Sequence, residues 1–430
     1  RWSSLAIQAA LPAGLLAFTL ICLFFGVASY SSTFVAQCHG AGDARGSVRA
    51  AAQGMWFSLV SWPLMLGLAP LGWLVMRLSG HPAELVAAER AYYDVLMLGS
   101  VLVSFGAAVG GYFTGRGGML LNTVANVLGC AVNIALDYVM IFGKLGLPAM
   151  GIAGAAWATV IASCVAPGIQ LAWLLREDEI RRQGLRRALA FDRRQMRQLL
   201  RYGVPSALHT LVDAGAFTLF VLLTGRLQPL DLAASNIGFS INAVAATPLV
   251  GIGMAASIVV GQHQGRRDSA AAARAGWSAL ALGWVYMAVV AVTFVAFPGG
   301  YYTLFHSREA PYSVAELVAV GRVMMVLMAL WGLLDTVNIV LAGALKGAGD
   351  TAFVMVYMLV MGWAVWIPGE LLLLYNGCGI LAAWAWLAFY VGLLAAGFFL
   401  RWKRGRWKTH DLLAGLAGPP AAAAATAPLP

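Results

Sequence analysis

The stretch VMMVLMALWGLLDTVNIVLAGAL at residues 323–345 places one carboxylate, Asp335, in the middle of an otherwise uncharged segment. A second stretch, VPSALHTLVDAGAFTLFVLL at residues 204–223, does the same with Asp213. About 20 apolar residues are enough for a helix to cross a bilayer, so both stretches have the length of membrane spans. An ionisable group at membrane depth is costly unless it faces a partner or a watery cavity. The two stretches therefore predict a membrane protein with a charged interior, suited to protons, metal ions or a cationic substrate.

The composition excludes a soluble protein. The chain of 430 residues is 61% hydrophobic and 11% charged, with a mean hydropathy of +0.79, whereas soluble domains carry about 25% charged residues. Lys and Arg cluster between apolar segments, which accounts for the net charge of +10 as basic cytoplasmic loops. No basic stripe with interleaved aromatic residues is present, so we predict no nucleic-acid partner. The five cysteines form no CxxC pair, and neither a disulfide framework nor a zinc site is indicated.

The hydropathy pattern predicts an all-α polytopic membrane protein. Strand-like alternation is absent, which argues against an outer-membrane barrel. Eleven apolar spans are expected, at residues 5–36, 54–76, 92–114, 119–142, 151–175, 202–224, 232–261, 275–298, 317–345, 352–375 and 379–400.

Loop composition predicts the domains and the orientation. We expect an N-terminal helical lobe at 1–175, a basic linker at 176–201, a C-terminal lobe at 202–408 and a disordered tail at 409–430, which is rich in Ala and Pro from residue 415. Most Lys and Arg residues fall in the linker, in a basic cluster at 401–408 and in every second loop. Because basic loops stay in the cytoplasm, the linker and the C-terminus are predicted to be cytoplasmic, in the inner (plasma) membrane.

The two halves of the chain resemble each other, which is typical of transporters built from repeats. Three pairs of segments match at offsets of 225, 232 and 228 residues. The pairs are 35–40 with 260–265, 110–116 with 342–347, and 151–157 with 379–384.

The offset implies that the span at 202–224 has a counterpart before residue 1. We therefore expect a first helix to be missing from this chain, and two six-helix bundles in the intact protein. An odd number of missing helices gives the two halves the same orientation, related by a pseudo-two-fold axis along the membrane normal.

Several motifs resemble the multidrug and toxic compound extrusion (MATE) family, and are most similar to its NorM-type branch. Pro205, with Asp213 and Phe217 after it, resembles the family's seventh helix. The run from Asp335 to Asp350 resembles its tenth helix and the turn that follows, and residues 133–143 resemble its fifth. The resemblance implies a V-shaped, two-lobed bundle that exports organic cations or drugs in exchange for Na⁺ or H⁺. It implies no enzyme activity and no cofactor besides the coupling ion. We further expect a monomer that contacts small organic cations and the lipid bilayer.

The resemblance also implies roles for single residues. Asp213 and Asp335 become the ion-coupling acids, and the ligands of Na⁺ if the protein is coupled to sodium. Two positions depart from the family pattern. Asp213 stands where this branch usually has Glu, and Trp331 stands where a Tyr often precedes the acid of the tenth helix, so no hydroxyl is available there. Two carboxylates in one cavity would raise each other's pKa, and either a cation or protons would relieve their repulsion.

Other intramembrane polar and aromatic residues are candidates for ion or substrate binding. They are His209, Asn236, Asn242, Asn338, Trp331 and Phe217. His209 lies one helical turn before Asp213 and suits a proton relay. The asparagines offer neutral oxygens, and the aromatic rings, with Phe239 and Trp363, suit flat cations. The structural alternative is helix–helix hydrogen bonding for the polar residues and packing for the aromatic ones.

Two further acids, Asp137 and Glu370, occupy matching places in the two halves, near the ends of their spans. For these two the sequence favours a solvated helix end or a helix–helix hydrogen bond over an ion site.

Two other functions fit parts of the sequence. Tyr93-Asp94 and the Gly347–Asp350 motif superficially match an intramembrane aspartyl protease, but the second motif sits at a loop edge, where an acid cannot share a proton inside the membrane. A lipid-linked sugar flippase of the same superfamily is the other alternative. The charges that we place in the membrane are mostly acidic, which favours cationic cargo.

Overall fold

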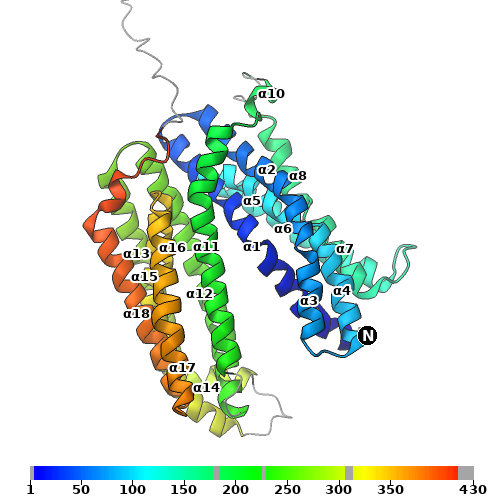
Figure 1. Ribbon diagram of the computed structural model, residues 1–430, viewed down its shortest axis with the longest axis vertical. Coiled ribbons are helices and arrows are strands. Elements are labelled where there is room, and N and C mark those ends of the chain that lie inside the picture. The colour runs from blue at the N-terminus through cyan, green and yellow to red at the C-terminus, as the bar shows by residue number, and fades with distance from the viewer. Residues whose placement is uncertain are drawn as a thin grey trace, which may run out of the picture. The chain divides into compact units, whose positions relative to one another are not determined.

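The computed structural model describes residues 4–177, 180, 182, 184–224, 229–305 and 313–414. This part of the chain consists of helices joined by turns and loops, with no strand (Figure 1). The all-α membrane fold predicted from the hydropathy pattern is confirmed. The first half contains α1 (Ser4–Gly40), α2 (Ala44–Gly67), α3 (Ala69–Leu78), α4 (Ala83–Leu98), α5 (Ser100–Gly115), α6 (Met119–Phe142), α7 (Gly151–Ala162), α8 (Val165–Leu174) and α10 (Leu185–Ala188). The second half contains α11 (Arg193–Thr224), α12 (Pro229–Gly265), α13 (Ser269–Ala296), α14 (Pro298–Phe305), α15 (Val314–Gly347), α16 (Thr351–Val360), η1 (Met361–Trp366), α17 (Ile367–Tyr375), α18 (Ile380–Arg404) and η2 (Arg406–Thr409).

Within the described residues, nine helices are long and apolar enough to cross a membrane. The number is ten if α4 and α5, which meet at a 42° bend, form one broken span. The predicted span at 202–224 lies in α11, where most side chains from residue 213 onward are outside the described residues. The number of eleven spans, the missing first helix and the axis relating the halves stay predictions.

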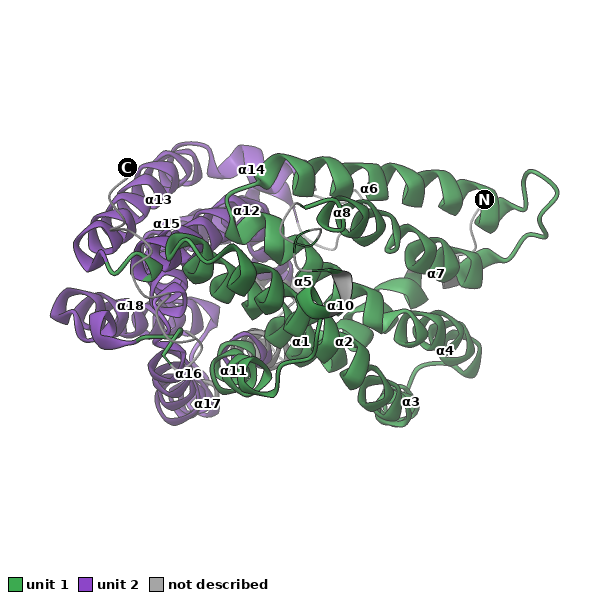
Figure 2. Ribbon diagram, turned by 90° about the horizontal axis from the view of Figure 1, so that it is seen from above, with its two compact units in different colours: residues 1–207, 265–267, 411–430 green, residues 208–264, 268–410 purple. Residues whose placement is uncertain are grey.

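The chain forms two compact units, shown in green and purple in Figure 2. Unit 1 comprises residues 1–207, 265–267 and 411–430, and unit 2 comprises residues 208–264 and 268–410. The lobe boundaries expected from the sequence, with the linker at 176–201 and the tail at 409–430, stay a prediction; most of that tail lies outside the described residues.

The internal repeat is visible in how the helices begin. Asp43 caps α2 by accepting a hydrogen bond from the Gly46 N–H at 2.8 Å. Asp268, 225 residues later, caps α13 by accepting one from the Ala271 N–H, also at 2.8 Å. A carboxylate at this position satisfies an N–H that the helix itself leaves without a partner. The same cap therefore starts two matching helices of the repeat, α2 and α13.

Unit 2 is held together by close helix packing along α12 and α15. A Cβ atom on Gly343 or Gly347 of α15 would collide with the backbone carbonyl of Gly253 or Ser257 on α12. Small residues let the backbones of membrane helices approach in this way, and van der Waals contact then drives their association. α15 also packs against α13 and α18, so it is the central helix of unit 2. A polar side chain on α15 can therefore lie inside this unit.

Unit 1 has a separate core built from α1, α2 and α5, with residues of α8 and α11. The end of the described chain joins this core. Leu412 is fully buried in it, and the Gln198 side chain of α11 donates a hydrogen bond to the Ala414 carbonyl at 2.8 Å. The short segment after η2 is therefore a fixed part of unit 1.

Candidate ion and substrate site

Asp335 lies half-buried on α15, close to the middle of that 34-residue helix. The Asn338 amide, one turn later, donates to Asp335 Oδ1 and to the Val391 carbonyl of α18, both at 3.3 Å. Asn338 is 7% exposed, and its own Oδ1 is buried without a hydrogen-bond partner among the described residues. The pair therefore presents a carboxylate and an unused amide oxygen inside unit 2, which is a donor set suited to a hard monovalent cation or a proton.

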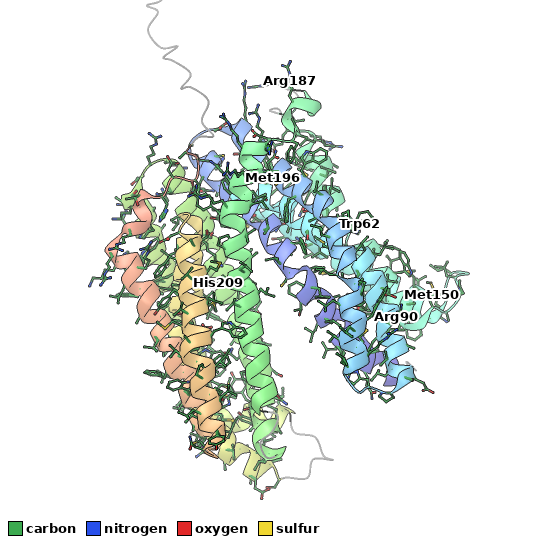
Figure 3. All side chains as sticks on the ribbon, in the orientation of Figure 1. Trp62, Arg90, Met150, Arg187, Met196 and His209 are labelled. Carbon is green, nitrogen blue, oxygen red and sulfur yellow. The ribbon has the colours of Figure 1, made fainter. Side chains whose placement is uncertain are left out.

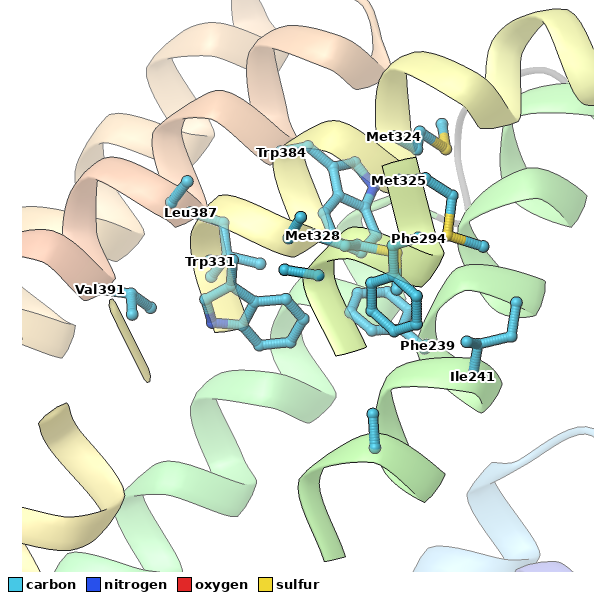
Figure 4. Close-up of a cluster of buried hydrophobic side chains, with 14 of the residues drawn as sticks. Phe239, Ile241, Phe294, Met324, Met325, Met328, Trp331, Trp384, Leu387 and Val391 are labelled. Atoms are coloured by element: carbon cyan, nitrogen blue, oxygen red, sulfur yellow. The ribbon is translucent and has the colours of Figure 1, made fainter. Parts of the chain in front are cut away.

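The aromatic residues near Asp335 form a packed cluster (Figure 4). Trp331, one turn before Asp335, is 9% exposed; its ring centroid lies 5.8 Å from that of Trp384 and 6.3 Å from that of Phe239. Phe239 and Trp384 stack at 4.8 Å. The Trp384 indole donates to the Ser235 hydroxyl at 2.8 Å, whereas the Trp331 indole N–H is buried without a hydrogen-bond partner among the described residues. Trp331 thus packs α15 against α12 and α18 and supports the helix turn that carries Asp335.

The candidates on α11 are only partly described. His209 lies in α11 (labelled in Figure 3), and its Nδ1 is buried without a hydrogen-bond partner among the described residues. The backbone of Asp213 and Phe217 continues the same helix, but their side chains lie outside the described residues. The expected His209–Asp213 relay and the pairing of Asp213 with Asp335 therefore stay predictions.

The two asparagines of α12 differ in exposure. Asn242 is half-buried, three residues after Phe239 on α12. Asn236 is exposed, and its carbonyl accepts a hydrogen bond from the Ser240 hydroxyl at 2.9 Å. Trp363, an aromatic candidate on η1, is 56% exposed. Asn242 is therefore better placed than Asn236 to reach the interior of unit 2.

In the part of the chain that the structure describes, no three His, Cys, Asp or Glu side chains gather closely enough to hold a metal ion. A sodium site at Asp335 would therefore draw its remaining ligands from neutral oxygens, such as Asn338 Oδ1 and backbone carbonyls, or from Asp213.

Unit 1 has a polar row of its own along one face of α6. Asn122, Asn126, Asn133 and Asp137 follow at helical spacing, and the Gln170 amide of α8 donates to Asn122 Oδ1 at 2.8 Å. Asn133 Nδ2 and Asp137 Oδ1 are buried without hydrogen-bond partners among the described residues. This pair has the same composition as the pair Asp335 and Asn338. The four-residue spacing was readable in the sequence, but it did not distinguish a solvated helix end from an ion site.

Tyr92 of α4 lies near Asp137, and a side-chain hydrogen bond joins Tyr92 to Thr159 of α7. Asp137 is half-buried, and its Oδ1 has no hydrogen-bond partner among the described residues. The solvated helix end and the helix–helix hydrogen bond expected from the sequence stay predictions.

The acids of the protease-like motifs are both engaged with basic residues. Asp94 is 43% exposed and lies 3.6 Å from Arg90 Nε. Asp350, which is 3% exposed, accepts hydrogen bonds from Arg401 Nε at 2.7 Å and Nη2 at 3.1 Å, and His410 Nε2 lies 3.4 Å from it. Burial would raise the pKa of the Asp350 carboxyl, but the hydrogen bonds and charges of His410 and Arg401 outweigh it and hold this pKa below its usual value. A carboxylate held ionised by an arginine is unsuited to a shared-proton protease pair.

Comparison with known proteins agrees with these features. The family model described as MatE matches residues 4–139 and again 205–369. A "Probable multidrug resistance protein NorM" of Bradyrhizobium diazoefficiens is 32% identical over 426 residues, which cover 95% of this chain and 84% of that protein. The protein of the same name in Pseudomonas aeruginosa is 29% identical over 401 residues, covering 90% of this chain and 79% of that protein.

Solved structures support the same fold. An outward-facing multidrug resistance MATE family transporter of the MOP superfamily superposes with a TM-score of 0.81 at 21% identity, covering 95% of this chain and 92% of that one. A MOP superfamily transporter from Pyrococcus furiosus superposes with a TM-score of 0.80, also at 21% identity and with the same coverage.

Proposed function

The chain belongs to the MatE family, and from this premise we propose that it is a secondary antiporter that exports organic cations and drugs in exchange for Na⁺ or H⁺. The resemblance inferred from the sequence is confirmed by the family match in both halves. The observation that carries the proposed mechanism is the pair Asp335 and Asn338, a carboxylate with an unused buried amide oxygen in the central helix of unit 2. No ATP-binding GxxxxGK[ST] motif occurs in the sequence, which favours an ion gradient as the driving force.

In the proposed cycle the acids of unit 2 hold either the coupling ion or the substrate. With Asp335 and Asp213 both ionised, the site attracts a cation; when Na⁺ or protons neutralise them, an organic cation loses its electrostatic partner and leaves. The ion and the substrate therefore compete for the same negative charge, and this competition is sufficient for antiport. In this proposal His209, one helical turn before Asp213, passes a proton to it.

We include Asp137 and Asn133 of unit 1 in the proposal as a second cation site. The Asp137 Oδ1 is buried without a hydrogen-bond partner among the described residues, and a bound cation would satisfy it; Asn133 would add its amide oxygen, since its Nδ2 is not held by a hydrogen bond among the described residues. For the whole protein we propose insertion in the plasma membrane as a monomer, with the basic linker and C-terminus in the cytoplasm.

The test is gradient-driven efflux of ethidium from liposomes that contain the purified protein. An imposed Na⁺ or H⁺ gradient identifies the coupling ion, and Asp335→Asn and Asp213→Asn are expected to abolish the driven flux. Glu316→Gln is the matched control, because Glu316 is an acid on the same helix as Asp335 but caps its exposed start. Wild-type flux in both Asp variants would overturn the proposed role of these acids. No flux with either gradient, in protein that melts cooperatively, would overturn the export function and favour a lipid-linked cargo.

A further inference from the structure

The side chain of Glu370 on α17 is shielded from solvent and makes no hydrogen bond to the described residues. The residue is 0% exposed, and both carboxylate oxygens are buried with no hydrogen-bond partner among the described residues. The solvated helix end and the helix–helix hydrogen bond favoured by the sequence are both contradicted. This acid also has no place in the transport mechanism proposed above.

The surroundings of Glu370 are apolar and aromatic. Trp366, one turn earlier, is 1% exposed and packs against Tyr390 at 5.6 Å between ring centroids. Gly369 lies directly against the indole of Trp386, so that a Cβ there would collide with it. An ionised carboxylate in such a place would lose its hydration without compensation, which costs several kcal/mol even after relaxation.

No charge among the described residues offsets this loss. α17 packs against η1 and α18, and neither oxygen of the Glu370 carboxylate has a hydrogen-bond partner among the described residues. η1 has no titratable side chain, and besides Glu370 α17 has only Tyr375, which is 90% exposed. The titratable side chains of α18 are Tyr390 in its membrane part and three basic residues in its last turn, Arg401, Lys403 and Arg404. Arg401 is engaged with Asp350. The neutral acid is therefore the stable form of Glu370 in this conformation.

The helix at this position is irregular. The six residues of η1 form a π-helical turn between α16 and α17, and Pro368 follows, which has no N–H to donate to the preceding turn. The Trp386 indole donates to the Trp366 carbonyl at 3.0 Å and so stabilises this turn from α18. π-turns inside helices often mark functional sites, and they provide a place where a helix bends or shifts register. Glu370 is positioned one turn after such a place.

We propose that Glu370 is a proton-binding site of unit 2, separate from Asp335, which holds its proton in the conformation described and releases it when the η1 turn rearranges and admits water. The second part of this proposal rests on the proposed antiport function. The matching position in unit 1 is Asp137, also near the end of its helix, so the repeat has an acid at the same sequence position in both halves. With the predicted orientation, Glu370 lies toward the end of its span that faces away from the cytoplasm.

Infrared spectroscopy of the intact chain in lipid nanodiscs tests the proton directly. At neutral pH we expect a carbonyl band of a protonated carboxylic acid in the wild type that is missing in Glu370→Gln. Glu316→Gln is the matched control, because it makes the same Glu-to-Gln change in unit 2 at an exposed helix start, and it should leave that band unchanged. A wild-type spectrum that Glu370→Gln leaves unchanged would overturn the proposal.

Transport measurements test the release of the proton. In liposomes, Glu370→Gln is expected to keep ethidium exchange without a gradient and to lose proton-driven efflux by at least about tenfold, whereas Glu370→Asp restores part of it. Proton-driven efflux at the wild-type rate in Glu370→Gln would overturn the release step. If the antiport function itself is wrong, the wild type will show no gradient-driven flux. The infrared band would still report whether Glu370 holds a proton, so the two failures can be told apart.

Discussion

Asp137 in unit 1 and Glu370 in unit 2 sit at matching places of an internal repeat, yet their surroundings differ. Asp137 is half-buried on a polar face of α6, with Asn133 one turn before it and Tyr92 near it. Glu370 is fully buried, and Trp366 stands one turn before it, where unit 1 has the asparagine. The exchange of an amide for an indole is one difference between the proposed cation site at Asp137 and the proposed proton site at Glu370.

Burial alone does not set the charge of an acid in this protein. Asp350 is buried nearly as deeply as Glu370, but Arg401 and His410 supply the charges and hydrogen bonds that keep it ionised. The three acids form a series: Asp350 has basic partners, Asp137 has neutral polar neighbours and Glu370 has apolar neighbours.

The largest effect is expected for Asp350→Asn. Removing one member of a buried ion pair leaves the arginine without compensation and typically destabilises a protein by about 3–5 kcal/mol. We expect a clear drop in the thermal unfolding midpoint at pH 7, together with loosening of α18 and η2. Glu316→Gln, at an exposed position on α15, is the control and should change the midpoint little.

The loss should also depend on pH with a defined sign. Because the folded-state pKa of Asp350 lies below its usual value, the unfolded chain takes up the proton first as the pH falls. The stability that Asp350 contributes is complete above the ordinary Asp pKa of about 3.9 and disappears as the pH falls through the folded-state pKa. The midpoints of wild type and Asp350→Asn should therefore converge in acid, and a gap that widens there would contradict the ion pair.

The sequence predicted the fold better than it predicted these differences. Apolar length and the repeated segments around Gly40 and Gly265 were enough for the helices and the repeat, because helix caps and small packing residues are local signals. Asp335 and Asn338 also stood out as candidates, since a polar residue in an apolar span is conspicuous, and their role in ion binding stays a prediction. The setting of Glu370 was missed because it depends on which face of α18 meets α17, and no pattern within either segment specifies that contact.

The second-largest effect is expected for Glu370→Lys. A lysine ammonium costs about 2.5–3.5 kcal/mol at the centre of a membrane helix, which is an upper value for Glu370 near the end of its span, and no acid among the described residues is placed to neutralise it at this position. Asp137→Lys should be tolerated better, because Asp137 is half-buried and has polar neighbours. Thermal unfolding of the two variants in the same lipid measures the contrast. Equal midpoints would contradict the difference in surroundings between the two acids.

The third prediction concerns transport by Asp137→Asn. If Asp137 binds the coupling cation, gradient-driven ethidium efflux should fall by at least about tenfold while the protein stays folded. Asp94→Asn provides the control in the same unit, because Asp94 is exposed and paired with Arg90. Flux at the wild-type rate in Asp137→Asn would assign the coupling ion to unit 2 alone.

The smallest effect is expected for Asn133→Ala, which changes a neighbour of the acid rather than the acid itself. Polar contacts inside membrane bundles are worth about 0.6 kcal/mol on average, so the cation concentration for half-maximal flux should rise about threefold with little change in stability. Asn126→Ala on the same face of α6 is the control, because the Asn126 amide already donates to the Asn122 carbonyl at 2.7 Å. The Asn133 Nδ2 has no such partner among the described residues, so this amide is not fixed by a hydrogen bond and can offer its Oδ1 to a cation; only its removal should weaken cation binding. The same shift in both variants would mean that the polar row acts as a whole, and that the amide beside Asp137 does not by itself distinguish this acid from Glu370.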